Sequence, residues 1–383
     1  MKRKALCILL SLLLTATLFG CSGGDVSVAF SAVKPWEYAG YEKCTYEVKR
    51  VYTADGGETV VADGTYTTEL TTSGDLTSVT NKFELQYNEN AHANNVDLTG
   101  RTVRNKNMKD SYESTAIFRK DSMVPVGIAT KTFDIGQRPL TDGTMGAREN
   151  NPKEGVAYRY EMDGADKYGD PQGDTYTINY DTNESSITTT VGSTVQEDGV
   201  YYRNYVEKTK SFTLGSGTRY DNEQLPYLVR ALANMQVKGS ATFYLTNMAD
   251  SYVRDAYVRH TMSLSCANKT TAVSLEAFND YLLYNKEGEL NKNDFNEYSV
   301  PCVRASVGLS DAKSGPAIEL LISDPSIFFV RSDKYFANPE GSAQELFATN
   351  RVIMSMTYTE YALSAARVAY KTIYTLVDYT TVR

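Results

Sequence analysis

The stretch CTYEVK at residues 44–49 decides the fold class of this chain. Cysteine, tyrosine and valine at positions 44, 46 and 48 alternate with threonine, glutamate and lysine at positions 45, 47 and 49. Successive side chains of a strand point to opposite faces, so this alternation is typical of a strand with one buried and one solvated face. The pattern extends to Tyr52 and predicts a half-buried strand.

The same period of two recurs along the chain, in Tyr66–Leu70, Phe83–Tyr87, Tyr112–Phe118, Val156–Met162 and Tyr176–Tyr180. Further strands are predicted over Thr242–Thr246, Thr261–Cys266, Cys302–Leu309, Ile318–Ile322, Val352–Tyr358 and Val368–Tyr379. The 29 tyrosines and many threonines also favour pleated sheet. We therefore predict an all-β, mostly antiparallel fold, built as a curved sheet, a half-barrel or a sandwich with one or two short helices.

Turn signals between these segments predict hairpins that follow one another along the chain. Asp55-Gly56 and Asp63-Gly64 are Asp-Gly steps, which favour the positive φ of tight hairpin turns. Ser73-Gly74-Asp75 and Thr182-Asn183-Glu184 are expected to reverse the chain in the same way.

One segment breaks the period of two and predicts a helix near residues 223–235. Its apolar side chains recur at helical spacing, at Leu225, Leu228, Val229 and Leu232. Asp221 or Asn222 offers an N-cap, and Pro226 falls in or near the first turn, where proline is tolerated. We expect this helix to cover one end of a sheet. A second, weaker helical pattern consists of Leu275, Phe278 and Leu282.

The N-terminus resembles the signal of bacterial lipoproteins. A basic segment, Lys2-Arg3-Lys4, precedes an apolar run from Ala5 to Phe19, and Leu18-Phe19-Gly20-Cys21 closes it. The stretch from Ala5 to Gly20 has 16 residues, which is short for a transmembrane helix that needs about 20. The resemblance implies that residues 1–20 are removed and that Cys21 carries the lipid anchor, at the extracytoplasmic face of a bacterial cell membrane.

After the signal we expect three segments: a tether at 21–41, an N-terminal β region at 42–217, and a C-terminal β region with the helix at 218–383. The boundary is placed near Ser216-Gly217, where a strand-only half gives way to the helix, although the two halves can share one sheet. The tether spans only about 20–25 Å as a flexible coil, which keeps the body near the bilayer.

The charge of the chain excludes some classes of partner. The full sequence carries a net charge of −8, and loss of the three basic residues of the signal makes it −11. Nucleic-acid binding requires clustered lysine and arginine, so we expect no nucleic-acid partner. An acidic surface also does not adhere to anionic lipid, which leaves the acyl anchor to hold the protein at the membrane.

Three cysteines remain once Cys7 leaves with the signal and Cys21 is lipidated. They are Cys44, Cys266 and Cys302, an odd number, so at least one thiol stays free or pairs between molecules. A bridge between Cys266 and Cys302 and a pair of buried thiols are both compatible with the sequence.

Catalytic motifs are weak throughout the sequence. The two histidines, His92 and His260, have no marked acid, thiol or hydroxyl partner. Ser310-Asp311-Ala312-Lys313 matches the S-x-x-K pattern of penicillin-recognising enzymes, but the lysine of their later K-T-G element would have to be the same Lys313. We therefore expect no enzymatic activity and no cofactor.

Two acidic segments resemble calcium sites in part. One is a glycine-rich stretch with Glu161, Asp163, Asp166, Asp170 and Asp174, whose spacing matches no defined loop. The other, residues 285–295, resembles the later part of an EF-hand, but its first ligand position falls on Leu283, which has no oxygen to donate. We expect no metal site in either segment.

Export, a short lipid tether, antiparallel strands and a covering helix together resemble the half-barrel lipoprotein-sorting envelope proteins of the LolA/LolB type, over roughly residues 42–240. The resemblance implies an acyl chain or similar apolar ligand held between sheet and helix, and the chain is about twice the size usual in that group. The residues that we expect to line the cavity are Phe83, Leu85, Phe118, Tyr158 and Tyr160.

Two hypotheses about the function follow from this interpretation. The first is a membrane-anchored, non-enzymatic surface lipoprotein that binds an apolar or amphiphilic ligand such as a lipid. The alternative is a structural or adhesive module of the cell envelope that contacts cell-wall glycan or a protein partner through exposed tyrosines.

Overall fold

The computed structural model of the protein describes residues 40–54, 57–91, 109–126, 128–137, 174–179, 185–197, 200–212, 220–234, 240–246, 259–274, 281–284, 299–309, 318–324, 328–331, 352–361 and 368–382. Within these residues nearly all regular structure is strand, which confirms the predicted all-β, mostly antiparallel fold.

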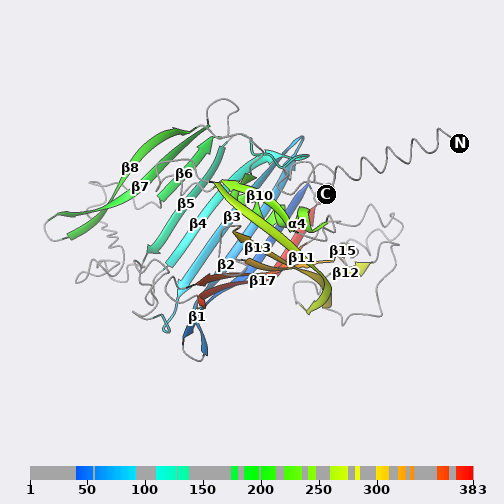
Figure 1. Cartoon of the computed structure of the whole chain (residues 1–383). Helices are drawn as coiled ribbons and strands as arrows, with labels where there is room; N and C mark the ends of the chain where they lie inside the picture. The colour runs from blue at the N-terminus through cyan, green and yellow to red at the C-terminus, as the bar shows by residue number, and fades with distance from the viewer. Residues whose placement is uncertain are drawn as a thin grey trace.

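One sheet of 15 strands dominates the molecule (Figure 1). Its N-terminal arm contains, in spatial order, β1 (Tyr41–Ala54), β2 (Gly57–Ser73), β3 (Leu76–Tyr87), β4 (Lys109–Arg119), β5 (Ile128–Gln137), β6 (Asp174–Asn179), β7 (Ser185–Glu197) and β8 (Val200–Phe212). Each of these strands pairs antiparallel with the next one in the chain. Hairpin connections of this kind follow directly from the alternating segments and turns of the sequence.

The C-terminal arm continues the sheet on the other side of β1. Its order is β17 (Val368–Val382), β16 (Ile353–Tyr361), β14 (Ile318–Ser323), β13 (Ser299–Leu309), β11 (Arg259–Ser274), β10 (Ser240–Thr246) and β9 (Tyr220–Asp221). Only the short contact of β9 with β10 is parallel among the described pairings. A separate small sheet pairs β12 (Tyr281–Tyr284) with β15 (Phe328–Arg331).

The two arms meet where the first strand pairs with the last. Tyr41 lies opposite Val382, and the antiparallel pairing of β1 with β17 continues to Tyr52 and Tyr370. The N-terminal and C-terminal β regions expected from the sequence therefore contribute to one continuous sheet. The boundary proposed near residue 217 lies outside the described residues.

A short helix lies against one face of this sheet. It begins with the 3-10 turn η1 (Asn222–Gln224) and continues as α4 (Leu225–Asn234), which confirms the helix predicted near 223–235 and the place of Pro226 in its first turn. η1 contacts β3 and β4 of one arm, while α4 contacts β11 of the other. The sheet therefore curves enough for both arms to touch the same helical segment, as the crossing of β10 and β11 over the N-terminal arm suggests in Figure 1.

The main core lies between the helix and the face of the sheet that we call the inner face. On β1 this face carries Cys44, Tyr46 and Val48, which are all buried, whereas Glu47 and Lys49 of the same strand are exposed. The stretch that decided the fold class thus buries the face that its alternation predicted. Buried residues of β2, β3, β4, β13, β14, β16, β17 and α4 complete the same core.

Of the four predicted turns, one is confirmed, one is wrong, and two lie outside the described residues. Gly74 begins the two-residue connection between Ser73 and Leu76 with a φ of +59°, which is typical of glycine at the first central position of a tight hairpin. Asp63-Gly64 forms no turn, because both residues lie inside β2 and pair with Gln86 and Leu85. Asp55-Gly56, between the paired residues Ala54 and Gly57, and residues 182–184 lie outside the described parts.

Other expectations are corrected by the strands. β5, β7, β8, β9, β12 and β15 were not predicted; β9, β12 and β15 have two to four residues, too few to show a period. Leu282, expected in a second helix, lies in β12 and pairs with Val330. Several predictions fall outside the described residues: the rest of the second helix (Leu275 and Phe278), the strand at Val156–Met162, and residues 1–39 with Cys21. The two acidic segments also lie outside them, apart from Asp174, which begins β6.

The cysteines of the core are thiols. Cys44 and Cys302 are both buried and free, so the bridge between Cys266 and Cys302 does not form in this structure. The register of β11 and β13 explains why: Cys266 lies opposite Ala305, and Cys302 lies opposite Thr271. Burial, with the nearby charge of Asp324, raises the pKa of Cys302 to about 12, so this thiol stays protonated.

Candidate functional site

The start of the helix is fixed by a reciprocal pair of hydrogen bonds. The Oδ1 atom of Asp221 accepts a bond of 2.8 Å from the backbone N–H of Glu223, and Oε1 of Gln224 accepts one of 2.9 Å from the N–H of Asp221. This is a capping box, in which an N-cap side chain and a side chain three residues later each satisfy a free N–H. Gln224 also donates to the backbone oxygen of Met123 at 2.9 Å, which ties η1 to the segment after β4.

A buried ion pair holds the body of α4 against β1. Arg230 and Glu42 form two hydrogen bonds, of 2.5 and 2.9 Å, and their side chains are 5% and 1% exposed. The hydroxyl of Tyr379 donates to the same carboxylate at 3.2 Å. Burial opposes the charged guanidinium, but the carboxylate of Glu42 outweighs burial and raises the pKa of Arg230. Arg230 therefore stays charged.

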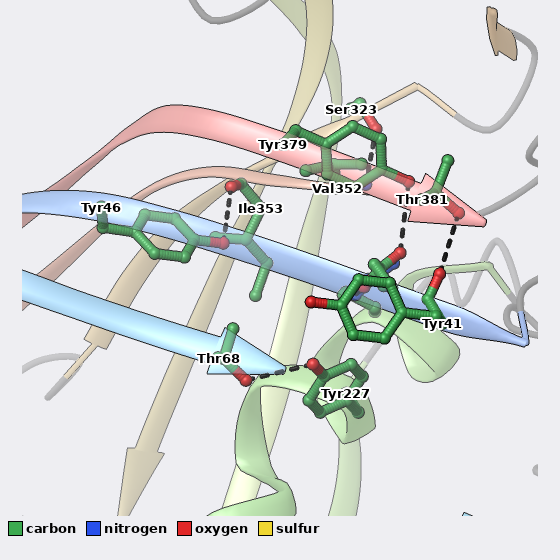
Figure 2. Close-up of polar contacts among 11 residues, drawn as sticks. Tyr41, Tyr46, Thr68, Tyr227, Ser323, Val352, Ile353, Tyr379 and Thr381 are labelled. Carbon is green, nitrogen blue, oxygen red and sulfur yellow. Dashed lines mark hydrogen bonds and ion pairs between the residues drawn. The ribbon is translucent and has the colours of Figure 1, made fainter. Parts of the chain in front are cut away.

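Tyrosine hydroxyls supply further links across the inner face (Figure 2). The hydroxyls of Tyr227 on α4 and Thr68 on β2 lie 3.0 Å apart. Tyr46 reaches across β17 and donates to the backbone oxygen of Ile353 at 3.0 Å. The contact between Thr68 and Tyr227, together with the ion pair, holds the helix on polar groups of an otherwise apolar face.

A second buried carboxylate, Glu223, lies at the helix start and faces β3 and β4. Ser114 donates to its Oε2 atom at 2.5 Å, and Asn81 Nδ2 lies 3.4 Å from the same oxygen. Asn81 also accepts a bond of 2.9 Å from the hydroxyl of Tyr66. The register of β2, β3 and β4 places Thr68, Asn81 and Ser114 side by side, so a polar row lies directly under Glu223.

Next to this polar row lies a group of rings that we call the aromatic cluster; it consists of Tyr66, Phe83, Tyr112, Tyr358 and Tyr374. Phe83 and Tyr112 stack with centroids 5.2 Å apart, and Tyr374 meets Tyr66 edge-on at 5.5 Å. Tyr358 lies 5.6 Å from Tyr374. Such offset and edge-on arrangements are the favourable ones for aromatic pairs.

The aromatic cluster draws on strands that are far apart in the sequence. Tyr66, Phe83 and Tyr112 are consecutive partners across β2, β3 and β4. Tyr358 and Tyr374 come from β16 and β17, on the other side of β1. Tyr66 is buried, whereas the other four members are only partly buried and pack against the core. These four rings are thus the partly solvated part of the cluster.

The charge of Glu223 is felt by the phenol groups of the cluster. Burial first, and then the negative charge of Glu223, raises the pKa of Tyr66 and of Tyr358. The pKa of Tyr112 is raised by burial, by Tyr66 and then by Glu223. All three hydroxyls are therefore neutral at physiological pH.

The residues expected to line a ligand cavity do not form one site. Phe83 belongs to the aromatic cluster, and Leu85 is buried in the core beside it. Phe118 is also buried, but it lies six residues beyond Tyr112 on β4, about 20 Å along the strand at ~3.3 Å per residue. Tyr158 and Tyr160 lie outside the described residues.

The sequence analysis did not predict which residues of the aromatic cluster are placed next to Phe83 by strand pairing. Tyr358 and Tyr374 were placed in predicted strands, but their position next to Phe83 depends on the pairing of the first strand with the last, which no local pattern reveals. Glu223 was read as part of a helix start. Its aromatic surroundings follow from tertiary packing.

The groups near the cluster offer binding chemistry: ring faces, phenol hydroxyls and a carboxylate. His260 lies in β11 opposite Leu245, and His92 is outside the described residues. Among the described residues, no group of histidine, cysteine and carboxylate side chains is arranged to hold a metal ion. None of the helices in these parts of the chain is long and apolar enough to cross a membrane.

Comparison with known proteins adds no identity. No protein-family model, no curated protein and no solved structure matches the chain. The likeness to the lipoprotein-sorting group therefore stays a prediction from the sequence pattern.

Proposed function

We propose that the protein is a non-enzymatic surface lipoprotein, anchored through Cys21 at the extracytoplasmic face of a bacterial cell membrane, that binds an apolar or amphiphilic ligand at the aromatic cluster. One observation carries the proposal. Four partly buried rings, Phe83, Tyr112, Tyr358 and Tyr374, gather on the inner face of the sheet. Concave sites lined by aromatic side chains with a few polar groups are the usual form of small-molecule sites.

A rough magnitude shows what such a ligand must supply. An aromatic side chain carries about 200 Å² of surface, so the exposed part of four partly buried rings is on the order of 150 Å². Covering it contributes about 4 kcal/mol at ~25 cal/mol per Å². Association costs at least that much, so a bound ligand must make further contacts beyond the exposed ring surface.

The lipid anchor supports an amphiphile as ligand. The signal-like N-terminus ends at Cys21, and the expected tether keeps the body within tens of ångströms of the bilayer. A ligand that partitions into membranes is concentrated at that distance. Replacement of Cys21 by serine is expected to abolish incorporation of radiolabelled palmitate and to release the protein from the membrane fraction.

Native mass spectrometry tests the binding function. The chain from Ser22 to Arg383 is exported from a bacterial host with a cleavable signal that adds no lipid, and it is purified without detergent. We expect an additional mass of several hundred daltons that organic solvent removes, and we expect the double variant F83A/Y112A to lack it. Glu113→Gln, on the opposite exposed face of β4, serves as the matched control.

A wild-type protein with no added mass would contradict the proposal. Capture of the same protein by purified cell-wall glycan, with no added mass, would favour the adhesive alternative instead.

A further inference from the structure

The carboxylate of Glu223 is an unusual neighbour for an apolar ligand. Glu223 is 4% exposed, and its partners Asn81 and Ser114 lie two residues from the partly buried rings of Phe83 and Tyr112 on the same strands. Placing a charge in such a position is costly unless hydrogen bonds stabilise it. Ser114 and Asn81 supply donors, and the residue lies in the turn that leads into α4, whose N-terminal end favours negative charge.

The aromatic rings near Glu223 also attract positive charge. The face of an aromatic ring carries negative potential and attracts cations within about 6 Å of its centre. Tyr66, Tyr112 and Tyr358 all sense the charge of Glu223 strongly enough for it to raise the pKa of their hydroxyls, after the larger effect of burial. Ring faces and carboxylate therefore create negative potential at the same place.

We infer that the ligand carries an organic ammonium group, which binds against the partly exposed rings of the aromatic cluster within the field of Glu223. This inference rests on the proposed binding function and adds the charge of the ligand to it. A substituted ammonium suits the site best, because its alkyl groups cover the rings and it loses less hydration than a bare ammonium. The charge also supplies the additional contact energy that the exposed ring surface lacks.

The net negative charge of the chain also favours a cationic ligand. The net charge of −8 attracts cations and repels anionic amphiphiles. On the same face, Arg50 of β1 lies opposite Thr372 of β17, which in turn lies opposite Tyr358 of the aromatic cluster. Its guanidinium lies 4.6 Å from the centre of the Tyr370 ring, and it donates to Thr372. The charge of Arg50 therefore limits the negative region on the Tyr358 side of the cluster, away from Glu223.

Calorimetric titration with chemically matched amphiphiles tests the inference. The probes are decyltrimethylammonium, neutral decyl maltoside and decanoate, each below its critical micelle concentration, together with tetramethylammonium. They are added to the chain from Ser22 to Arg383, which retains every described strand. We expect the decyl cation to bind at least about tenfold more tightly than the other two decyl probes, since one cation–π and charge contact is worth about 1.4 kcal/mol or more.

The variants assign that preference to residues. Glu223→Gln keeps the shape and hydrogen bonds of the side chain and is expected to reduce the preference to less than about threefold. Glu113→Gln removes a carboxylate that is 57% exposed on the other face of β4, and it should leave the preference unchanged. If Glu223→Gln disturbs folding by circular dichroism, Tyr112→Leu provides the second test, because it removes one partly exposed ring.

The outcomes separate this inference from the proposed function. Equal affinity for the three decyl probes, or tighter binding of decanoate, would overturn the ammonium and leave the binding function standing. Binding of tetramethylammonium as tight as that of the decyl cation would support the ammonium and contradict an amphiphilic ligand. Binding of none of the probes would overturn both.

Discussion

At the scale of single residues, Glu42 and Arg230 show how charge is used inside this core. Both side chains are almost fully buried, and the second carboxylate oxygen also receives the Tyr379 hydroxyl. Burying such a pair yields little net stability, because the loss of hydration offsets the attraction. Removing one partner is different, since it leaves a charge in the core without compensation. The pair therefore acts mainly to fix the position of α4.

We predict that Arg230→Met destabilises the protein by about 3–5 kcal/mol, because Glu42 is left charged and buried. The double variant E42L/R230M should recover much of that loss. Lys82→Gln breaks an exposed pair with Glu113 of 3.2 Å, and it should cost less than about 1 kcal/mol. Urea unfolding followed by circular dichroism measures all three. A double variant as unstable as Arg230→Met would contradict a purely positional role for the pair.

Sequence reasoning about the site was also least successful at the level of single residues. Phe83 was identified because it lies on the apolar face of an alternating strand, and that face is indeed inward. Phe118 satisfies the same rule, yet it lies at the other end of β4. Alternation reports the face of a strand, but not the position along it that meets a neighbour.

At the scale of elements, the close spacing of β2 and β3 depends on Gly64, which the sequence predicted to lie in a hairpin turn. Asp63-Gly64 reads as a hairpin turn, but the strand continues through it. A Cβ atom on Gly64 would lie 1.9 Å from the backbone oxygen of Glu84 and 2.9 Å from the Cα atom of Leu85. The glycine is needed for the close approach of two strands.

We predict that Gly64→Ala destabilises the protein by about 2 kcal/mol or more, because backbone atoms of β3 must move to admit the methyl group. Gly57→Ala is the matched control in the same strand, since nothing lies within 4 Å of its Cβ position. That variant should stay within about 0.5 kcal/mol of wild type. Thermal unfolding compares the two, and equal melting temperatures would show that β2 and β3 separate easily.

The helix was the element best predicted from sequence. Helical spacing from Leu225, a cap at Asp221 and the position of Pro226 all act within one turn of their own residues, so they are visible without tertiary structure. Leu282 gave the opposite result. Its apparent helical spacing with Phe278 was overridden by pairing with Val330, a residue far away in the chain.

At the scale of the whole molecule, the order of the strands makes the two halves interdependent. β1 lies between β2 and β17, and the helix that follows the N-terminal arm packs against β1 and β2. Sequence patterns predicted most of the strands, including β1 and β17, but not this closure, because loop connections leave the pairing of the first and last strands undetermined. The core that results is rich in buried tyrosine, including Tyr46, Tyr66 and Tyr227.

This tyrosine-rich core predicts a steep loss of stability at alkaline pH. Burial is the first cause of the raised pKa of five phenols, those of Tyr46, Tyr66, Tyr112, Tyr227 and Tyr358. In the unfolded chain they ionise near pH 10, so above that pH the folded state holds more protons than the unfolded state. Their contribution is complete below pH 10 and is lost as pH rises, by up to about 1.4 kcal/mol per pH unit for each phenol.

Circular dichroism and tyrosinate absorbance at alkaline pH measure this effect together. We expect part of the tyrosines to titrate only as the strand signal disappears. Full titration of all tyrosines near pH 10 with the strand signal intact would contradict the burial of these phenols.

The central claim is that a ligand binds the partly exposed rings on the inner face, and cross-linking from neighbouring positions of β4 tests it most directly. The photoreactive residue p-benzoylphenylalanine is placed at Tyr112, on the inner face, or at Glu113, on the opposite exposed face, in the full-length chain in living cells. After irradiation, mass spectrometry of the purified chain detects adducts. The account predicts an adduct of a small amphiphile at position 112 and none at 113. No adduct at 112, or the same adduct at both positions, would contradict it.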